Sequence, residues 1–145
     1  MYNLFMTDFQ FHTPITVHYS DLDTQWHVNN AHFFSFIEQA RVSYLVELGL
    51  FKGQNFLDFP IIVADAHMTY RQPIPFGATV DVGVAVTKIG NKSLTFEYSI
   101  LDPAHEKVYA TAETIMVMFD YRKNVTMAVP QDWRERIGRF EGKAF

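Results

Sequence analysis

Residues 29–49 read NNAHFFSFIEQARVSYLVELG, and this stretch decides the fold class. Its apolar side chains recur every three or four positions, which is the period of one helix face. The members of this stripe are Phe33, Ile37, Ala40, Tyr44 and Leu48, widened by Phe34 and Leu45. We expect Asn29 or Asn30 to cap the first turn and Gly49 to end the helix, because Asn accepts from unpaired N–H groups and glycine tolerates positive φ.

Segments with alternating apolar residues lie on both sides of this predicted helix. The strand before it covers residues 15–20, with Ile15, Val17 and Tyr19 on one face. The strands after it cover residues 61–71, 78–88, 93–101 and 107–119. Short turns rich in Pro, Gly, Asn and Asp separate the later strands, which implies antiparallel neighbours. The sequence therefore predicts an α+β fold, in which one long helix packs against one face of a curved antiparallel sheet.

A chain of 145 residues has the size of one ordinary domain, and we expect a single domain over residues 1–145. Residues 1–12 are expected to form an N-terminal tail. Residues 130–141 are expected to form a short C-terminal helix that begins near Pro130 or Asp132. The 14 Phe and 7 Tyr residues suit a sheet whose hollow must be filled around a lone helix.

Composition excludes several classes of protein. The chain has no cysteine, which removes disulfides, thiolate metal sites, iron–sulfur clusters and a cysteine nucleophile. A net charge of −4 argues against a nucleic-acid binder, since such proteins need a basic surface. No secretory signal and no stretch of 18 apolar residues is present, so we expect a cytoplasmic protein without a membrane partner.

Charge is unevenly distributed along the chain. Residues 1–65 contain seven acidic and only two basic residues, whereas residues 66–145 contain nine acidic and ten basic residues. The first half would repel an anion. We therefore expect an anionic ligand to approach residues of the second half.

The most concentrated polar stretch is DLDTQWHVNN, residues 21–30, immediately before the predicted helix. A helix N-terminus carries unpaired backbone N–H groups and a partial positive charge, so it can hold an anion or an oxyanion. A carboxylate a few residues upstream would face the same atom. On local composition alone, the simpler interpretation is that Asp21 and Asp23 only turn and cap the chain.

Metal and serine chemistry are both disfavoured. A calcium loop beginning at Asp21 would need an oxygen ligand and then glycine where Gln25 and Trp26 stand. His27 and His32 are five residues apart, so they do not share a helix face as a metal-binding pair would. No serine lies in a G-x-S-x-G elbow, and no phosphate-binding glycine motif occurs. We expect no metal and no cofactor, and any hydrolysis must depend on a carboxylate.

Two runs of sequence are similar to those of a known family. The run YSDLDTQWHVNNAHF, residues 19–33, and the run FIEQAR, residues 36–41, resemble hotdog-fold acyl-CoA thioesterases, and more narrowly the 4-hydroxybenzoyl-CoA thioesterase-like branch. Weaker matches follow at residues 70–73, 77, 90–93 and 116–120. One departure is Trp26, where glycine is common in the family, so the backbone conformation of this loop is in question.

The resemblance implies a sheet wrapped around a central helix, and a homodimer or dimer-based tetramer in which two subunits build each active site. It implies hydrolysis of an acyl-CoA to a free acid and CoA. Asp23 would be the catalytic carboxylate, as nucleophile or as general base toward water. Asn30 would supply a backbone N–H to the thioester oxygen.

The resemblance also implies where the phosphates of CoA would bind. The turn Asn91–Lys92–Ser93 matches the position at which this family contacts the nucleotide, and a solvated hairpin turn is the alternative. Arg71 and Lys88 are further basic candidates. His27 either contacts substrate or is a hydrogen-bonded structural histidine.

Three side chains outside this stretch are open to a simple structural interpretation. Glu38 and Arg41 have the spacing of a helical ion pair, although Glu38 could instead reach a cavity across a dimer. Asp21 is expected to shape the loop. The arginines of the C-terminal helix are expected to form a solvated face; they are Arg134, Arg136 and Arg139.

Two other functions remain compatible with the resemblance. One is a non-catalytic protein of the same fold that binds acyl thioesters. The other is a thioesterase that acts on acyl-carrier-protein. Turnover on CoA esters, compared with carrier-protein thioesters, separates these functions.

Overall fold

The computed structural model describes residues 8–53 and 55–145, and its main elements follow the predicted order. Strand β1 (Phe11–Thr16) precedes the long helix α1 (Asn30–Glu47). The later strands are β2 (Ile61–Tyr70), β3 (Thr79–Ile89), β4 (Ser93–Leu101) and β5 (Val108–Asp120). The remaining elements are two 3-10 helices (Tyr19–Asp21 and Phe56–Asp58), strand β6 (Val125–Thr126) and helix α2 (Gln131–Glu141).

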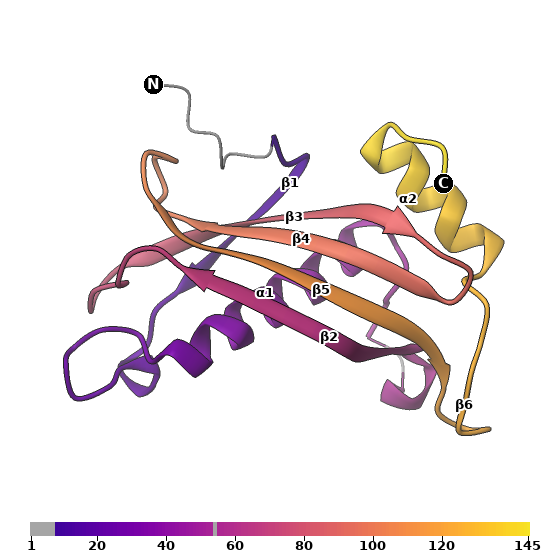
Figure 1. Ribbon diagram of the computed structural model, residues 1–145, viewed down its shortest axis with the longest axis horizontal. Helices are drawn as coiled ribbons and strands as arrows, with labels where there is room; N and C mark the ends of the chain where they lie inside the picture. The colour runs from indigo at the N-terminus through magenta and orange to yellow at the C-terminus, as the bar shows by residue number, and fades with distance from the viewer. Residues whose placement is uncertain (1–7, 54) are drawn as a thin grey trace.

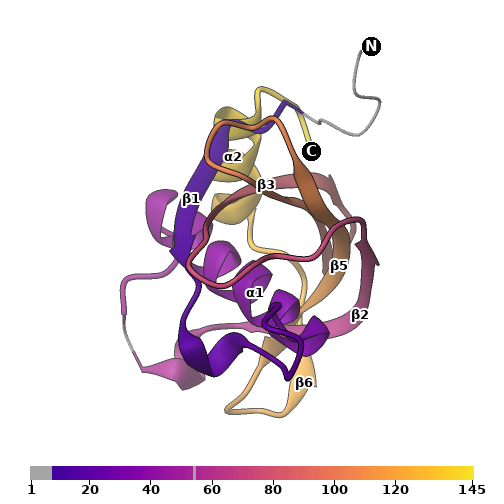
Figure 2. The same ribbon diagram turned by 90° about the vertical axis from the view of Figure 1, so that its left-hand side faces the viewer.

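One antiparallel sheet curls around α1 (Figures 1 and 2). The strand order is β1-β3-β4-β5-β2, and β6 pairs with β5. The register shifts within three strands, between Val63 and Asp65, between Val86 and Lys88, and between Ile100 and Leu101. Such irregularities bend a strand and increase its twist, which lets the sheet close around the helix. The predicted α+β hotdog fold is confirmed.

The helix ends and the buried faces follow the sequence pattern. The Asn29 side chain accepts from the Ala31 N–H at 2.9 Å and caps α1, and Gly49 has a φ of +71° after its last turn. Alternate residues of β3 and β4 face the helix and are 0–2% exposed: Val80, Val82, Val84, Val86, Leu94, Phe96, Tyr98 and Ile100. The core is therefore the space between α1 and the concave face of the sheet.

The first strand differs from its prediction. It spans Phe11–Thr16 rather than residues 15–20, so it begins inside the expected tail, whose residues 1–7 lie outside the described part. Ile15 and Val17 are buried as expected, but Tyr19 is 74% exposed. The chain leaves the sheet because the Asp21 carboxylate accepts the His18 N–H at 2.7 Å and closes a 3-10 turn.

Helix α2 lies where the short C-terminal helix is expected. Of its three arginines, Arg139 is exposed as expected, whereas Arg134 and Arg136 are partly buried and bonded to neighbouring elements. Arg134 donates to the backbone carbonyl of Gly90 in the β3–β4 turn. Arg136 donates to the Asp132 carboxylate at 3.0 Å and to the Leu48 carbonyl at 3.3 Å. The bonds to the Gly90 and Leu48 carbonyls join α2 to the β3–β4 turn and to the end of α1.

Arg41 is buried, and the helical ion pair with Glu38 does not form among the described residues. Its side chain lies in the core, where the guanidinium donates to the Tyr98 hydroxyl at 3.2 Å. Tyr98 also shares a 2.8 Å hydrogen bond with Thr114. Burial raises the pKa of Tyr98, so the hydroxyl stays protonated.

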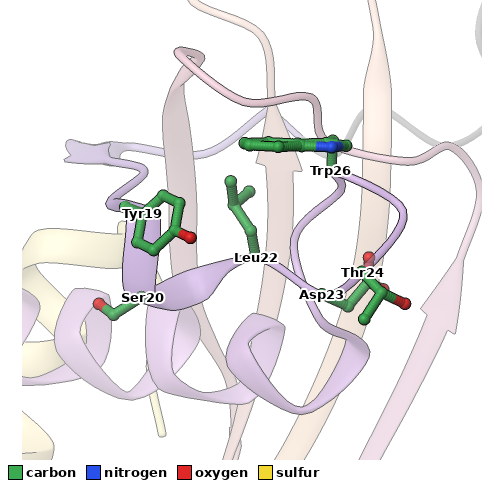
Figure 3. A pocket seen from close by; sticks show the side chains of 6 residues that line it. All are labelled: Tyr19, Ser20, Leu22, Asp23, Thr24 and Trp26. Atoms are coloured by element: carbon green, nitrogen blue, oxygen red, sulfur yellow. The ribbon is translucent and has the colours of Figure 1, made fainter.

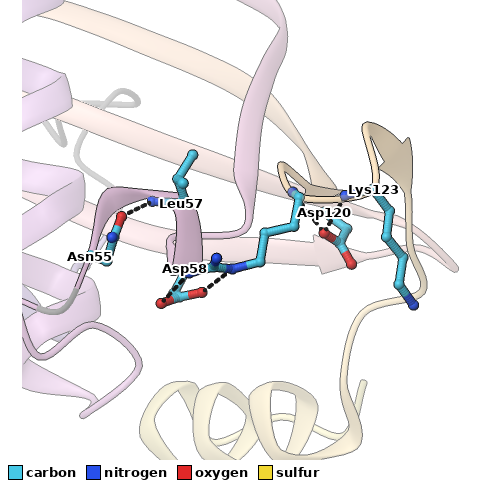
Figure 4. A network of polar contacts seen from close by, with 6 residues as sticks. Asn55, Leu57, Asp58, Asp120 and Lys123 are labelled. Atoms are coloured by element: carbon cyan, nitrogen blue, oxygen red, sulfur yellow. Dashed lines mark hydrogen bonds and ion pairs between the residues drawn. The ribbon is translucent and has the colours of Figure 1, made fainter.

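An exposed network connects the loop before β2 with the β5–β6 turn (Figure 4). Asn55 caps the short helix that contains Asp58, and Arg122 donates to Asp58 at 3.1 and 3.3 Å. The Lys123 backbone N–H donates to Asp120 and lowers the pKa of its carboxyl group. Because these charges are exposed, they set the turn geometry more than the stability.

No helix in the described part of the chain is long and apolar enough to cross a membrane.

Glu141 joins the end of α2 to the core by two hydrogen bonds. One of its carboxylate oxygens accepts from the Tyr44 hydroxyl at 2.6 Å and from the Val86 N–H at 3.0 Å. Val86 lies beside the irregularity in β3, so this carboxylate satisfies an amide at a point where the strand register shifts. Burial, and then the bond to Glu141, raise the pKa of Tyr44.

We expect Glu141→Ala to lower the free energy of unfolding by about 1–3 kcal/mol, because two partly buried donors lose their acceptor. Glu141→Gln keeps a side-chain oxygen at that position, so it should lower the free energy of unfolding by less than half of this amount. Urea unfolding at neutral pH measures both changes. Equal stability of Glu141→Ala and the unmodified protein would contradict this role.

Candidate active site

The polar stretch before α1 forms a tight loop that is closed by its own backbone. The Asp23 N–H donates to the His27 carbonyl at 2.9 Å, and the Trp26 N–H donates to the Asp23 carbonyl at 3.2 Å. Leu22 and Val28 form an isolated antiparallel bridge across the base of the loop. The loop therefore holds the Asp23 backbone in a defined position beside the start of α1.

Trp26 adopts the left-handed conformation, with a φ of +63°. This backbone geometry favours glycine and costs other residues about 1 kcal/mol or more. Its indole packs against two other aromatic rings, those of Tyr19 at 6.4 Å and Phe76 at 6.0 Å between centroids. The loop therefore has the conformation that glycine would adopt without strain, although a tryptophan stands there.

Asp23 directs one carboxylate oxygen to the loop and leaves the other available. Oδ1 accepts from the Gln25 N–H at 2.8 Å, and no hydrogen bond to Oδ2 occurs within residues 8–53 and 55–145. The side chain is half-buried and borders a cavity of 440 Å³. The cavity is lined by Asp23, His27, Val28, Asn30, Phe33, Tyr70, Arg71, Gln72 and Pro73.

The first turn of α1 includes one cavity residue, Asn30, whose amide has no acceptor in the part of the chain that the structure describes. The Asn29 N–H donates to the Asp21 carbonyl, the Ala31 N–H to the Asn29 side chain, and the His32 N–H to the Asn29 carbonyl. Asn30 is the first residue of the helix, so its N–H has no intrahelical acceptor. The Asn30 N–H is therefore the one backbone donor of this turn that has no hydrogen-bond acceptor among the described residues.

Tyr70 is a cavity residue that the sequence did not identify. Its hydroxyl donates to the Asn30 carbonyl at 2.8 Å, and its ring packs edge-on against Phe33 at 5.0 Å. Burial raises the pKa of Tyr70, which keeps the hydroxyl a donor. This contact connects the end of β2 to the start of α1. In the sequence, Tyr70 stands at the end of an alternating strand just before a proline turn, and this position could have indicated a cavity residue.

Asp21 behaves as the loop-shaping residue that was expected. It borders neither hollow of this region, and its carboxylate accepts from His18 N–H and contacts the His32 Nδ1 at 2.8 Å. The two neighbouring aspartates therefore have different surroundings. Both carboxylate oxygens of Asp21 have a polar partner, whereas Asp23 has an available oxygen.

A second hollow, of 510 Å³, lies on the other side of the loop (Figure 3). Tyr19, Leu22 and Trp26 form its apolar side, and Asp23 and Thr24 lie at its other end. Asp23 therefore stands between the 440 Å³ cavity beside the helix start and this second hollow. The 440 Å³ cavity is the better candidate for chemistry, because it is the one of the two that includes Asn30 at the start of α1.

The predicted site residues fall into two groups. Asp23, Asn30, His27 and Arg71 line the same cavity. The turn 91–93 lies at the opposite end of the sheet, where Lys92 Nζ donates to Thr126 at 2.9 Å. A single chain does not bring these groups together.

The arrangement suits attack on a carbonyl carbon. A backbone N–H at a helix start stabilises negative charge that develops on the carbonyl oxygen, an effect worth about 3 kcal/mol in other enzymes. A carboxylate on the same cavity can attack directly or take a proton from water. No cluster of three metal-ligating side chains lines the cavity within the described residues.

Comparison with known proteins shows the family of this chain. Residues 17–137 match the family described as the Thioesterase-like superfamily. The chain is 25% identical over 125 residues to the long-chain acyl-CoA thioesterase FadM of Escherichia coli, covering 86% of this chain and 95% of FadM.

Solved structures are also similar. A thioesterase of Thermus thermophilus, in complex with coenzyme A and zinc, has a TM-score of 0.84 and 28% identity, covering 97% of this chain and 100% of that chain. A 1,4-dihydroxy-2-naphthoyl-CoA thioesterase of Synechocystis has a TM-score of 0.78 and 21% identity, with 88% and 94% coverage, and shares the fold.

The left-handed backbone at position 26 can be tested with two variants that both remove the indole. Trp26→Gly should have a free energy of unfolding about 1 kcal/mol higher than Trp26→Ala, because alanine retains the strain and glycine does not. Urea unfolding of the two variants gives the difference directly. If Trp26→Ala is as stable as Trp26→Gly, the strain at this position is absent.

Proposed function

Because this chain belongs to the thioesterase-like superfamily, we propose that it is an acyl-CoA thioesterase that hydrolyses an acyl-CoA to a free acid and CoA. The observation that carries the proposal is the shared cavity of the Asp23 carboxylate and the start of α1 at Asn30. The similarity to FadM and to a thioesterase bound to coenzyme A supports the CoA ester as substrate.

In the proposed reaction the thioester oxygen accepts a hydrogen bond from the Asn30 N–H. Two routes use Asp23. In the first, its available oxygen attacks the carbonyl carbon, CoA leaves as the thiolate, and water then hydrolyses the mixed anhydride. In the second, Asp23 takes a proton from a water that attacks the same carbon, and the tetrahedral intermediate expels CoA. Both routes need the carboxylate ionised and both give the free acid and the CoA thiol.

The edge of the sheet supports a homodimer. Strand β2 is the last strand of the path, and its ten residues have no partner on one side within the described chain. Ile62 and Val63 on it are 41% and 50% exposed. A long, partly apolar edge strand is a template for pairing with another chain, and a twofold axis would pair two copies of β2 antiparallel.

Such a dimer would also complete the site. Ile61, at the start of β2, pairs with Met118, whose N–H donates to the Lys92 carbonyl, so the turn 91–93 lies near that end. Tyr70, at the other end of β2, bonds Asn30. Antiparallel pairing of two β2 strands would bring the turn 91–93 of one copy toward the Asp23 cavity of the other. We propose that Asn91, Lys92 and Ser93 contact the CoA phosphates in this way, with His27 and Arg71 contacting substrate from the first chain.

We expect Asp23→Asn to reduce thiol release from acyl-CoAs by at least about a hundredfold, since amide nitrogen and oxygen neither attack nor accept the proton at neutral pH. Far-UV circular dichroism and sedimentation should be unchanged. Asp132→Asn, an exposed change on α2, is the matched control and should retain activity.

The substrates should be short-chain, long-chain and aryl CoA esters, with the corresponding carrier-protein thioesters alongside. Full activity of Asp23→Asn would overturn the role of Asp23. Binding without turnover on every ester would indicate an acyl-thioester binding protein. Faster turnover of carrier-protein thioesters would indicate the carrier protein as the natural substrate.

Lys92→Ala should raise KM for acyl-CoA several-fold with little change in kcat, because it removes one charge from the phosphate contacts. The KM for an acyl-pantetheine, which lacks those phosphates, should not change. Lys143→Ala is the control for loss of a surface charge.

Mixed dimers test whether two chains share the site. In a dimer of one Asp23→Asn chain and one Lys92→Ala chain, one site regains both Asp23 and Lys92. Coexpression should therefore restore a component with the original KM. Absence of this component in purified mixed dimers would show that Lys92 does not act across the interface.

A further inference from the structure

Three side chains from distant parts of the sequence converge on the outer face of the sheet. His12 lies on β1, Asp81 on β3 and His105 in the turn between β4 and β5. Asp81 Oδ2 lies 3.0 Å from His12 Nδ1 and is also in contact with His105 Nε2. One donor atom from each of the three residues lies within 4.8 Å of the others.

The strand register explains why His12 and Asp81 meet. His12 pairs with Gly83 and Pro14 with Asp81, so the two side chains are diagonal neighbours on one face. Val80 and Val82 on the opposite face are completely buried against the core. A Cβ on Gly83 would lie 2.5 Å from the Phe9 ring and 3.2 Å from the His12 ring. The glycine therefore leaves the space in which the His12 imidazole lies.

His105 reaches the same carboxylate through an unusual backbone conformation. Its φ is +58°, the left-handed region that histidine seldom adopts, and its N–H donates to the Asp102 carbonyl at 2.9 Å. Asp102 in turn accepts from the Lys107 N–H at 2.6 Å, which closes the turn. The turn thus directs the His105 ring toward Asp81.

The hydrogen bonding of the cluster is incomplete. His12 Nδ1 is buried and has no hydrogen-bond partner in the described part of the chain, although Asp81 Oδ2 lies only 3.0 Å away. The two imidazole rings are stacked, with centroids 4.7 Å apart and an angle of 22° between planes. A buried ring nitrogen without a partner costs free energy, and a bound cation would supply the missing partner.

We propose that His12, Asp81 and His105 bind a Zn²⁺ ion. Two neutral imidazoles and one carboxylate are typical zinc ligands, and hard cations such as Mg²⁺ prefer oxygen ligands. The ligands would be His12 Nδ1, His105 Nε2 and Asp81 Oδ2. Zinc binding requires the side chains to move until these three atoms lie about 2.0–2.2 Å from a common centre. The His105 side chain is 38% exposed, so water can occupy the fourth position.

This site is separate from the proposed catalytic cavity. None of the three residues lines either hollow beside Asp23. The ion would connect the edge strand β1 to β3 and to the β4–β5 turn, and its binding energy would add to the stability of that edge. The alternative is a hydrogen-bonded cluster in which Asp81 accepts from histidine without any metal.

Zinc titration of untagged, chelator-treated protein tests the proposal. We expect about one Zn²⁺ bound per chain with micromolar or tighter affinity, and a melting temperature that rises with zinc concentration. Co²⁺ should give visible absorption bands typical of a four-coordinate site with nitrogen ligands. Millimolar Mg²⁺ should leave the melting temperature unchanged.

The variants His105→Gly and Asp81→Asn should each lose the zinc-dependent shift and weaken zinc binding by at least about tenfold. Glycine suits the positive φ at position 105, which offsets stability lost with the His105–Asp81 contact, so His105→Gly should remain folded without zinc. His18→Ala removes an exposed histidine that lies outside both the cluster and β2, and it is the matched control. Absence of micromolar binding, or unchanged binding in His105→Gly and Asp81→Asn, would overturn the site and leave a hydrogen-bonded cluster.

Discussion

The burial of one long helix in the hollow of a single sheet is the constraint on which this structure depends. A twisted sheet does not surround a helix unless its strands bend, and register shifts in β2, β3 and β4 accompany that bending. Large side chains from the helix and from the sheet fill the space between α1 and the strands. Tyr44, for example, packs against Phe11, Phe96 and Phe140. This explains the high aromatic content of a small chain.

The same packing positions the candidate site. Because α1 is held along the concave face, its first turn lies beside the end of β2, where Tyr70 bonds the Asn30 carbonyl. The N–H groups of Asn29, Ala31 and His32 have acceptors, whereas that of the cavity residue Asn30 has none among residues 8–53 and 55–145. The loop before the helix, closed by its own hydrogen bonds, holds Asp23 at the same cavity.

Much of the fold was predictable because its signals are local. Alternation in β3 and β4 and the helical period in α1 reflect which side chains face the core. The prediction was wrong for the first strand, where a hydrogen bond donated by the His18 N–H to the Asp21 carboxylate ends the alternation before Tyr19. It was also wrong for Arg41, since only the tertiary structure places the Tyr98 hydroxyl beside that guanidinium.

The sequence by itself determined the elements, their order and the polar loop before α1, since periodicity, capping and turn chemistry act between near neighbours. It also contained the runs that are similar to a known family. Only the tertiary structure decided which distant residues meet: Tyr70 with Asn30, Glu141 with Tyr44 and Val86, and His12 with Asp81 and His105. These contacts depend on sheet order and register, which follow from packing the whole chain around α1 and leave no short-range pattern in the sequence.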